Sequence, residues 1–138
     1  IEVLESLGHE VYDVGAETFN PSDDYPDFTK ELAQKVANGE ADRGVMVCGS
    51  GVGASIAANK IRGVRASVCH DTYSAHQGVE HDDMNVLCMG SRIVGNSLAI
   101  ELVGTFASAR FSEEDRHRRR LDKVISMEID ASGIHPVE

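Results

Sequence analysis

The stretch that most restricts the fold runs from Val45 to Lys60 and reads VMVCGSGVGASIAANK. Its apolar run ends in a cysteine, Cys48, and glycines follow at positions 49, 51 and 53. The run is typical of a buried strand, and the residues after the glycines have a helical pattern. A strand, a glycine loop and a helix in this order indicate one unit of a parallel α/β domain.

The same alternation of strand and helix continues along the chain. Apolar runs predict strands at residues 9–15, 44–49, 63–69 and 85–91. Helical stripes predict helices around residues 1–7, 28–36, 50–60, 71–80 and 98–106, and a last helix from about Ser112. Asp71 or Thr72 is expected to cap a helix start, and Gly8 and Gly39 to end helices. The pattern favours a parallel sheet covered on both faces, with ligands at the carboxyl ends of the strands.

Both ends of the chain carry an expectation. A helix that opens a parallel α/β domain normally follows a strand, so we expect a strand upstream of Ile1. We expect one domain over residues 1–138, with an irregular tail at about 127–138.

Composition excludes several classes of function. The net charge is −10, from 13 Lys and Arg against 23 Asp and Glu, so general attraction to nucleic acid or to an anionic membrane is not expected. No apolar run approaches the ~20 residues that a membrane-spanning helix needs. The three cysteines show neither a C-x-x-C pair nor metal-ligand spacing, which favours reduced thiols in a cytoplasmic protein without a metal site.

Cys48 is the first candidate for chemistry. A helix start beside it favours the thiolate and presents N–H groups to an oxyanion, although a buried structural cysteine is an equally simple interpretation. Cys69 and Cys88 lie in apolar strands and are expected in the core. A C-x5-R phosphatase would need arginine at position 54, which is alanine. A weak dinucleotide fingerprint at Gly49-x-Gly51-x-x-Ala54, with Asp71 as the ribose-binding acid, stays open.

A second candidate is the run SEEDRHRRRLDK from Ser112 to Lys123. Pairs of the type Glu114–Arg118 and Asp115–Arg119 indicate an ordinary salt-bridged helix. Arg116 and Arg120, however, share one helical face with only Glu113 to offset Arg116, which favours an anion such as phosphate between them. His81 is expected in a polar loop, where a histidine can act as acid or base near neutral pH.

Together these stretches resemble the ribose-5-phosphate isomerase B family, which includes allose- and galactose-6-phosphate isomerases. The resemblance rests on residues 24–28, 44–69, 73–75, 80–95 and 116–120, above all on CGSGVGASIAANK. It implies a three-layer α/β/α Rossmann-like sandwich. It also implies a homodimer or a dimer of dimers with shared active sites, acting on a sugar phosphate without a metal or another cofactor.

The resemblance also implies roles for individual residues. Cys48 would move the proton between C1 and C2, and Ser50 would move protons between the sugar oxygens. His81, from the partner chain, would open the sugar ring. The remaining implied binding residues hold the enediolate, the sugar or the phosphate: Gly49, Gly51, Val52, Gly53, Ala54, Asp82, Arg116 and Arg120, with Arg92 assisting from the partner.

Two departures leave the substrate open. The family begins with a strand that carries an Asp-His pair, and Asp82 replaces the usual asparagine. The implied reaction is the interconversion of ribose 5-phosphate and ribulose 5-phosphate through an enediolate. Isomerisation of another aldose phosphate, such as allose 6-phosphate or a tetrose phosphate, is the alternative, as is a non-catalytic module that binds a sugar phosphate or a nucleotide.

Overall fold

The computed structural model describes residues 1–131, which form three strands and six helices. In chain order these are α1 (Glu2–Ser6), α2 (Tyr25–Ala37), β1 (Gly44–Cys48), α3 (Val52–Ala58), β2 (Ala66–Val68), α4 (Thr72–Asp82), β3 (Val86–Gly90), α5 (Asn96–Ser108) and α6 (Asp115–Ala131). None of the described helices is long and apolar enough to cross a membrane.

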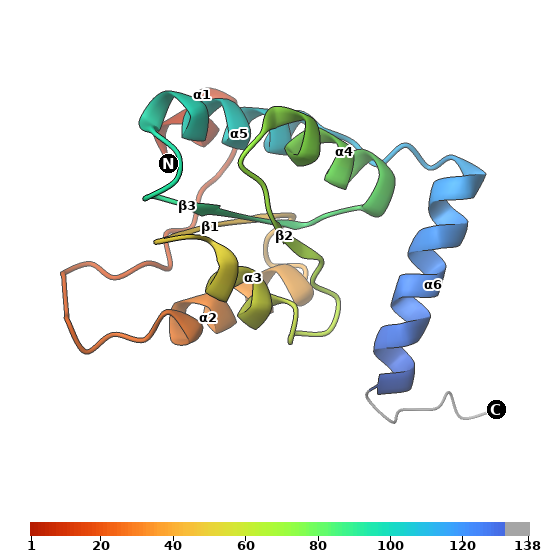
Figure 1. Ribbon diagram of the computed structural model, residues 1–138, viewed down its shortest axis with the longest axis horizontal. Helices are drawn as coiled ribbons and strands as arrows, with labels where there is room; N and C mark the ends of the chain where they lie inside the picture. The colour runs from red at the N-terminus through yellow and green to blue at the C-terminus, as the bar shows by residue number, and fades with distance from the viewer. Residues whose placement is uncertain (132–138) are drawn as a thin grey trace.

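The sheet is parallel and centred on β3, in the order β1-β3-β2. Helices α1, α4 and α5 cover one face and α2 and α3 the other, while α6 stands apart from both layers (Figure 1). All five residues of β3 are buried, as a continuous apolar run predicts for a strand covered on both faces. The structure therefore has the expected α/β/α Rossmann-like sandwich.

Alternate residues of β3 face two separate cores. Leu87 and Met89 pack with Leu102 and Phe106 of α5 and their neighbours. Val86 and Cys88 pack on the opposite face, against α2 and α3. Cys69 and Cys88 are both buried, as expected, and burial raises the pKa of the Cys88 thiol to about 12.

Helix boundaries follow the predicted signals. The side chain of Asp71 caps α4 by accepting a hydrogen bond from the Ser74 N–H at 2.7 Å. Gly8 and Gly39 follow α1 and α2 with φ of 86° and 74°, left-handed values that favour glycine. These caps confirm the expected ends.

The predicted strand at residues 9–15 is wrong for the described structure, in which this segment belongs to no strand or helix. Its apolar residues are at most half-buried, and Tyr12 is 60% exposed. A strand needs a neighbour that pairs with its backbone groups, and no described residue forms a ladder with this segment. Apolar alternation alone does not supply that partner.

The expected irregular tail is also partly wrong. Helix α6 continues to Ala131, so residues 127–131 are helical. The Glu128 carboxylate in this part of α6 accepts a hydrogen bond from the Gly63 N–H at 2.9 Å, which ties the end of the helix to the loop before β2. Residues 132–138 lie outside the described part of the chain.

Arg43 joins the loop before β1 to the end of α5. Its guanidinium donates hydrogen bonds to the carbonyl oxygens of Phe106, Ala107 and Ala109, and it lies 5.3 Å from the centroid of the Phe106 ring. The last carbonyls of a helix lack intrahelical partners, so this half-buried cation satisfies them from another element.

We expect Arg43→Ala to lower the free energy of unfolding by about 1.5–3 kcal/mol, because several charge-assisted hydrogen bonds are lost. Urea unfolding followed by circular dichroism measures this change. The control is Arg62→Ala, since Arg62 is exposed and should change stability by less than about 0.5 kcal/mol. Equal effects of the two substitutions would contradict the role given to Arg43.

Candidate active site

The Cys48 side chain lies where β1 ends and its loop turns toward α3. The Gly51 N–H donates a hydrogen bond to Cys48 Sγ at 3.1 Å. The Cys48 carbonyl oxygen accepts a hydrogen bond from the Ser91 N–H at 2.8 Å, which ties the end of β1 to the loop after β3. The sulfur thus lies at the end of β1 with a backbone hydrogen-bond donor aimed at it.

Two glycines allow this loop to close over the end of β3. Gly51 has φ of 80°, and a Cβ there would lie 3.0 Å from the Met89 carbonyl carbon. A Cβ on Gly90 would lie 2.7 Å from Ser50 Cα, closer than real Cβ atoms approach. The loop therefore needs glycine at both positions.

The N–H groups at the start of α3 divide into two pairs. Gly51 donates to Cys48 Sγ, and Val52 donates to Ser50 Oγ at 3.3 Å. The N–H groups of Gly53 and Ala54 have no acceptor among the described residues, as expected in the first turn of a helix. Two N–H groups next to a thiol thus remain available for an anionic oxygen.

Two further side chains lie against this loop. A Cβ on Gly53 would meet the Tyr25 hydroxyl oxygen at 2.8 Å, so the Tyr25 ring covers the start of α3. The Arg92 side chain, 3.8 Å from a Cβ built on Gly49, lies beside the loop of its own chain, whereas the resemblance implied that Arg92 assists from a partner. Sequence reasoning gave Tyr25 no role; its only signal was its place in the DYPDF segment.

His81 belongs to a second cluster of polar side chains. It lies in the last turn of α4 and not in a loop, so that prediction is wrong. Apolar Ala75 and Val79 continue the buried face of α4, which keeps the backbone helical through His81. Its ring stacks on His117 of α6, with centroids 3.9 Å apart and 26° between the planes.

His117 is the residue of this cluster that sequence reasoning missed. It is 2% exposed, and its Nδ1 lies 2.5 Å from Ser112 Oγ. Burial, then the nearby His81 and Arg116, lower the pKa of His117 from its ordinary value of 6.5. The available signal was spacing, because His117 and the buried Leu121 are four residues apart and share the inner face of α6.

The arginines lie on the outer side of the same helix. Helix α6 begins at Asp115 rather than near Ser112, since Glu113 has the left-handed φ of 57°. Arg116 pairs with Glu114 at 2.8 Å instead of Glu113, whereas Arg120 has no ion pair to a described residue. The expected Glu114–Arg118 and Asp115–Arg119 pairs are absent among the described residues, and Arg118 pairs with Glu113 at 3.4 Å. Arg120 thus remains available for an anion.

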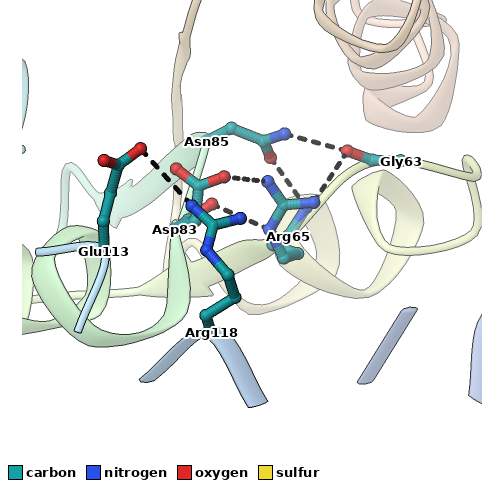
Figure 2. A network of polar contacts seen from close by, with 6 residues as sticks. All are labelled: Gly63, Arg65, Asp83, Asn85, Glu113 and Arg118. Atoms are coloured by element: carbon teal, nitrogen blue, oxygen red, sulfur yellow. Dashed lines mark hydrogen bonds and ion pairs between the residues drawn. The ribbon is translucent and has the colours of Figure 1, made fainter. Parts of the chain in front are cut away.

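A polar network holds the turn that follows His81 and Asp82. Arg65 donates to the carbonyl oxygen and to the carboxylate of Asp83, both at 2.8 Å (Figure 2). Asn85 accepts from the Arg65 N–H at 2.7 Å and donates to the Gly63 carbonyl oxygen at 2.9 Å. Asp83 has φ of 49°, so these bonds stabilise a left-handed residue that ends α4.

A cleft of about 950 Å³ opens beside this turn, between α6 and the outer edge of β2. Asp82 and Gln77 line it, together with Leu121 of α6. Cys48 is not among its lining residues, so this cleft and the thiol belong to different parts of the molecule.

The two clusters lie at opposite ends of the sheet. Cys48 pairs with Gly90 at the carboxyl end of β3, whereas the turn after His81 leads into the amino end of β3 at Val86. The length of β3 alone separates these ends by about 13 Å. In Figure 1 the strands point left, toward the Cys48 loop, and α6 stands at the right. One chain therefore does not bring the predicted site residues together.

The structure weakens the dinucleotide alternative. The Asp71 carboxylate, which that fingerprint would place on a ribose, instead accepts the Ser74 N–H, and this bond lowers the Asp71 pKa. No group of three His, Cys, Asp or Glu in residues 1–131 is arranged to hold a metal ion.

Comparison with known proteins assigns the family. The model of the family described as Ribose/Galactose Isomerase matches residues 1–124. The chain belongs to this family. It is 44% identical to ribose-5-phosphate isomerase B of Escherichia coli K12, over 91% of this chain and 83% of that protein. It is 39% identical to D-erythrulose-4-phosphate isomerase 2 of Mycolicibacterium smegmatis, over 86% of this chain and 78% of that protein.

A solved structure of the family agrees with the fold. Ribose-5-phosphate isomerase B from Mycoplasma genitalium with bound ribulose-5-phosphate superimposes with a TM-score of 0.86 at 42% identity. The match covers 92% of this chain and 84% of that one. The family resemblance read from the CGSGVGASIAANK stretch is confirmed.

The lowered pKa of His117 predicts a pH dependence of stability. Below about pH 6.5, His117 binds a proton in the unfolded chain but stays neutral in the folded chain. The stability that is fully present above pH 6.5 is therefore lost as the pH falls toward the lowered pKa of His117 in the folded chain. We expect the free energy of unfolding to fall between pH 7.5 and 5.5, and His117→Asn to flatten that fall. The exposed His9, replaced by Asn, is the control. Equal slopes in wild type and His117→Asn would contradict the prediction.

Proposed function

We propose that the chain interconverts ribose 5-phosphate and ribulose 5-phosphate through an enediolate, with Cys48 as the base. The observation that supports this is the arrangement of the β1–α3 loop. A thiol sulfur that accepts the Gly51 N–H lies at the start of α3, where the N–H groups of Gly53 and Ala54 have no acceptor within residues 1–131. Removing a proton next to a carbonyl requires both a base and a group that stabilises the resulting oxyanion.

The proton transfers follow from these positions. Cys48 as thiolate takes the C2 proton of the open-chain aldose and returns it to C1, while the O2 proton moves to O1 through the Ser50 hydroxyl. The N–H groups of Gly53 and Ala54 stabilise the negative charge on oxygen in the enediolate. No net proton is gained or lost, as isomerisation requires.

The phosphate group needs cations that the Cys48 loop alone does not hold. Arg116 and Arg120 are on α6, at the opposite end of the sheet, and Asp82 and His81 lie near them. We propose that a second copy supplies this cluster to the Cys48 loop, so that active sites form between the protomers of a homodimer or of a dimer of dimers. Arg92 then contributes from the same chain as Cys48.

A tetrose phosphate is the second candidate substrate. Relatives of comparable identity are named for erythrulose 4-phosphate and for galactose 6-phosphate, so family membership alone does not select the sugar. Ribose 5-phosphate is preferred because the Cys48-Gly-Ser arrangement is intact and the structural relative holds ribulose-5-phosphate.

A panel of aldose phosphates in D2O tests the reaction and the base together. We expect wild type to form ketose and to exchange the C2 proton most rapidly with ribose 5-phosphate. Cys48→Ala should lower the rate by about 100-fold or more, because the proposed base is removed. Cys69→Ala, in the core, should keep the rate and lose stability. A Cys48→Ala variant with more than a few per cent of the wild-type rate would rule out Cys48 as the base.

Mixing two inactive variants tests the shared site. Each proposed site takes Cys48 from one chain and His81 from the other. A dimer of one Cys48→Ala chain and one His81→Asn chain therefore has one site with both residues intact and one site that lacks both. After denaturing, mixing in equal amounts and refolding, about a quarter of the sites should be intact. Assays of ketose formation should show that recovery, with refolded single variants as controls. No recovery, despite mixed dimers on a native gel, would place the whole site in one chain.

A further inference from the structure

The two ring nitrogens of His81 have different neighbours. Gln77 lies one turn earlier on α4, and its amide Nε2 is 3.2 Å from His81 Nδ1. His81 Nε2 makes no hydrogen bond to a described residue, and the Glu80 carboxylate is 3.9 Å away. The His81 side chain is 31% exposed. The stack on His117 fixes the plane of the ring.

These contacts select one tautomer of the neutral imidazole. With the Gln77 NH2 group facing Nδ1, the amide donates and Nδ1 accepts, which corresponds to the tautomer with the proton on Nε2. The Glu80 carboxylate lies on the Nε2 side and favours a proton there as well. Both neighbours therefore favour the same arrangement.

We propose that Gln77 is a positioning residue that holds His81 with its proton on Nε2, so that His81 meets the sugar as a hydrogen-bond donor and not as a base. The proposal rests on the proposed function, in which His81 opens the ring of the bound aldose phosphate. It gives this step a donor whose direction is fixed before the sugar binds.

The ring-opening step then balances as follows. In a ribofuranose phosphate the C1–O4 bond breaks, the C1 hydroxyl loses its proton, and the C1=O group forms. That proton reaches O4 through solvent water. The His81 Nε2–H stays on nitrogen and stabilises the negative charge that builds on O4, as a neutral imidazole can in a preorganised site.

The tautomer is measured directly by NMR of 15N-histidine-labelled protein at a pH near 9, well above the ordinary imidazole pKa of about 6.5. His81→Asn identifies the His81 signals. We expect wild type to show the proton on Nε2. Gln77→Glu should move it to Nδ1, because a carboxylate accepts where the amide donated, and Gln77→Leu should give a mixture. Gln77 is only half-buried, so both variants should fold.

Kinetics then separate ring opening from proton transfer. Ribulose 5-phosphate is acyclic, so exchange of its C1 protons in D2O needs no ring opening. Gln77→Glu should lower the rate of ketose formation from ribose 5-phosphate by about 10-fold or more and leave this exchange within about twofold. His76→Gln is the control, since His76 is next along the helix but contacts Glu80 and not His81.

The proposal is overturned if wild-type His81 carries its proton on Nδ1, or if Gln77→Glu leaves the tautomer unchanged. It is also overturned if ketose formation and C1 exchange fall equally. The NMR result needs no substrate, so a wild-type protein that does not turn over ribose 5-phosphate would refute the proposed function while the tautomer was still decided.

Discussion

The close approach of the Cys48 loop to the end of β3 is the contact on which the site depends. It requires the absence of a side chain at Gly90, where a Cβ would lie 2.7 Å from Ser50 Cα, and the left-handed backbone of Gly51. With the loop in this position, the Gly51 N–H donates to the Cys48 sulfur, and α3 begins with two N–H groups that find no acceptor in the described part of the chain. The chemistry of the thiol is thus a consequence of backbone packing.

The parallel sheet imposes the second constraint. Each helix that follows a strand returns to the amino end of the sheet. The last residues of α4, and the start of α6 after the end of α5, therefore lie far from the carboxyl ends of the strands. His81 and Arg120 are placed there for this reason, and Cys48 is not. If all three act on one substrate, a second chain must provide part of the site. The division follows from the direction of the strands and not from details of the side chains.

Local signals predicted what depends on local physics. The buried strand β3 and the cap at Asp71 can be predicted from the sequence, because burial and capping each require particular residue types at particular spacings. The segment at residues 9–15 was misread because pairing depends on a partner that its own residues do not specify. His81 was misplaced because polar composition suggested a loop, whereas two buried apolar residues keep α4 helical to Asp82.

Contacts between distant elements were the least predictable part of the site. Helix α6 buries only His117 and Leu121, and Val124 and Met127 are 50% and 68% exposed, so apolar packing holds it weakly. Its start is fixed by polar contacts instead: the Ser112 N–H donates to the Glu80 carbonyl oxygen at 3.0 Å, and Ser112 Oγ contacts His117. Because His117 stacks on His81, the contacts that place the arginine helix also place the imidazole. The cations proposed for the phosphate and the donor proposed for the sugar ring are therefore held by the same contacts. A substitution that moves α6 would also move the His81 ring.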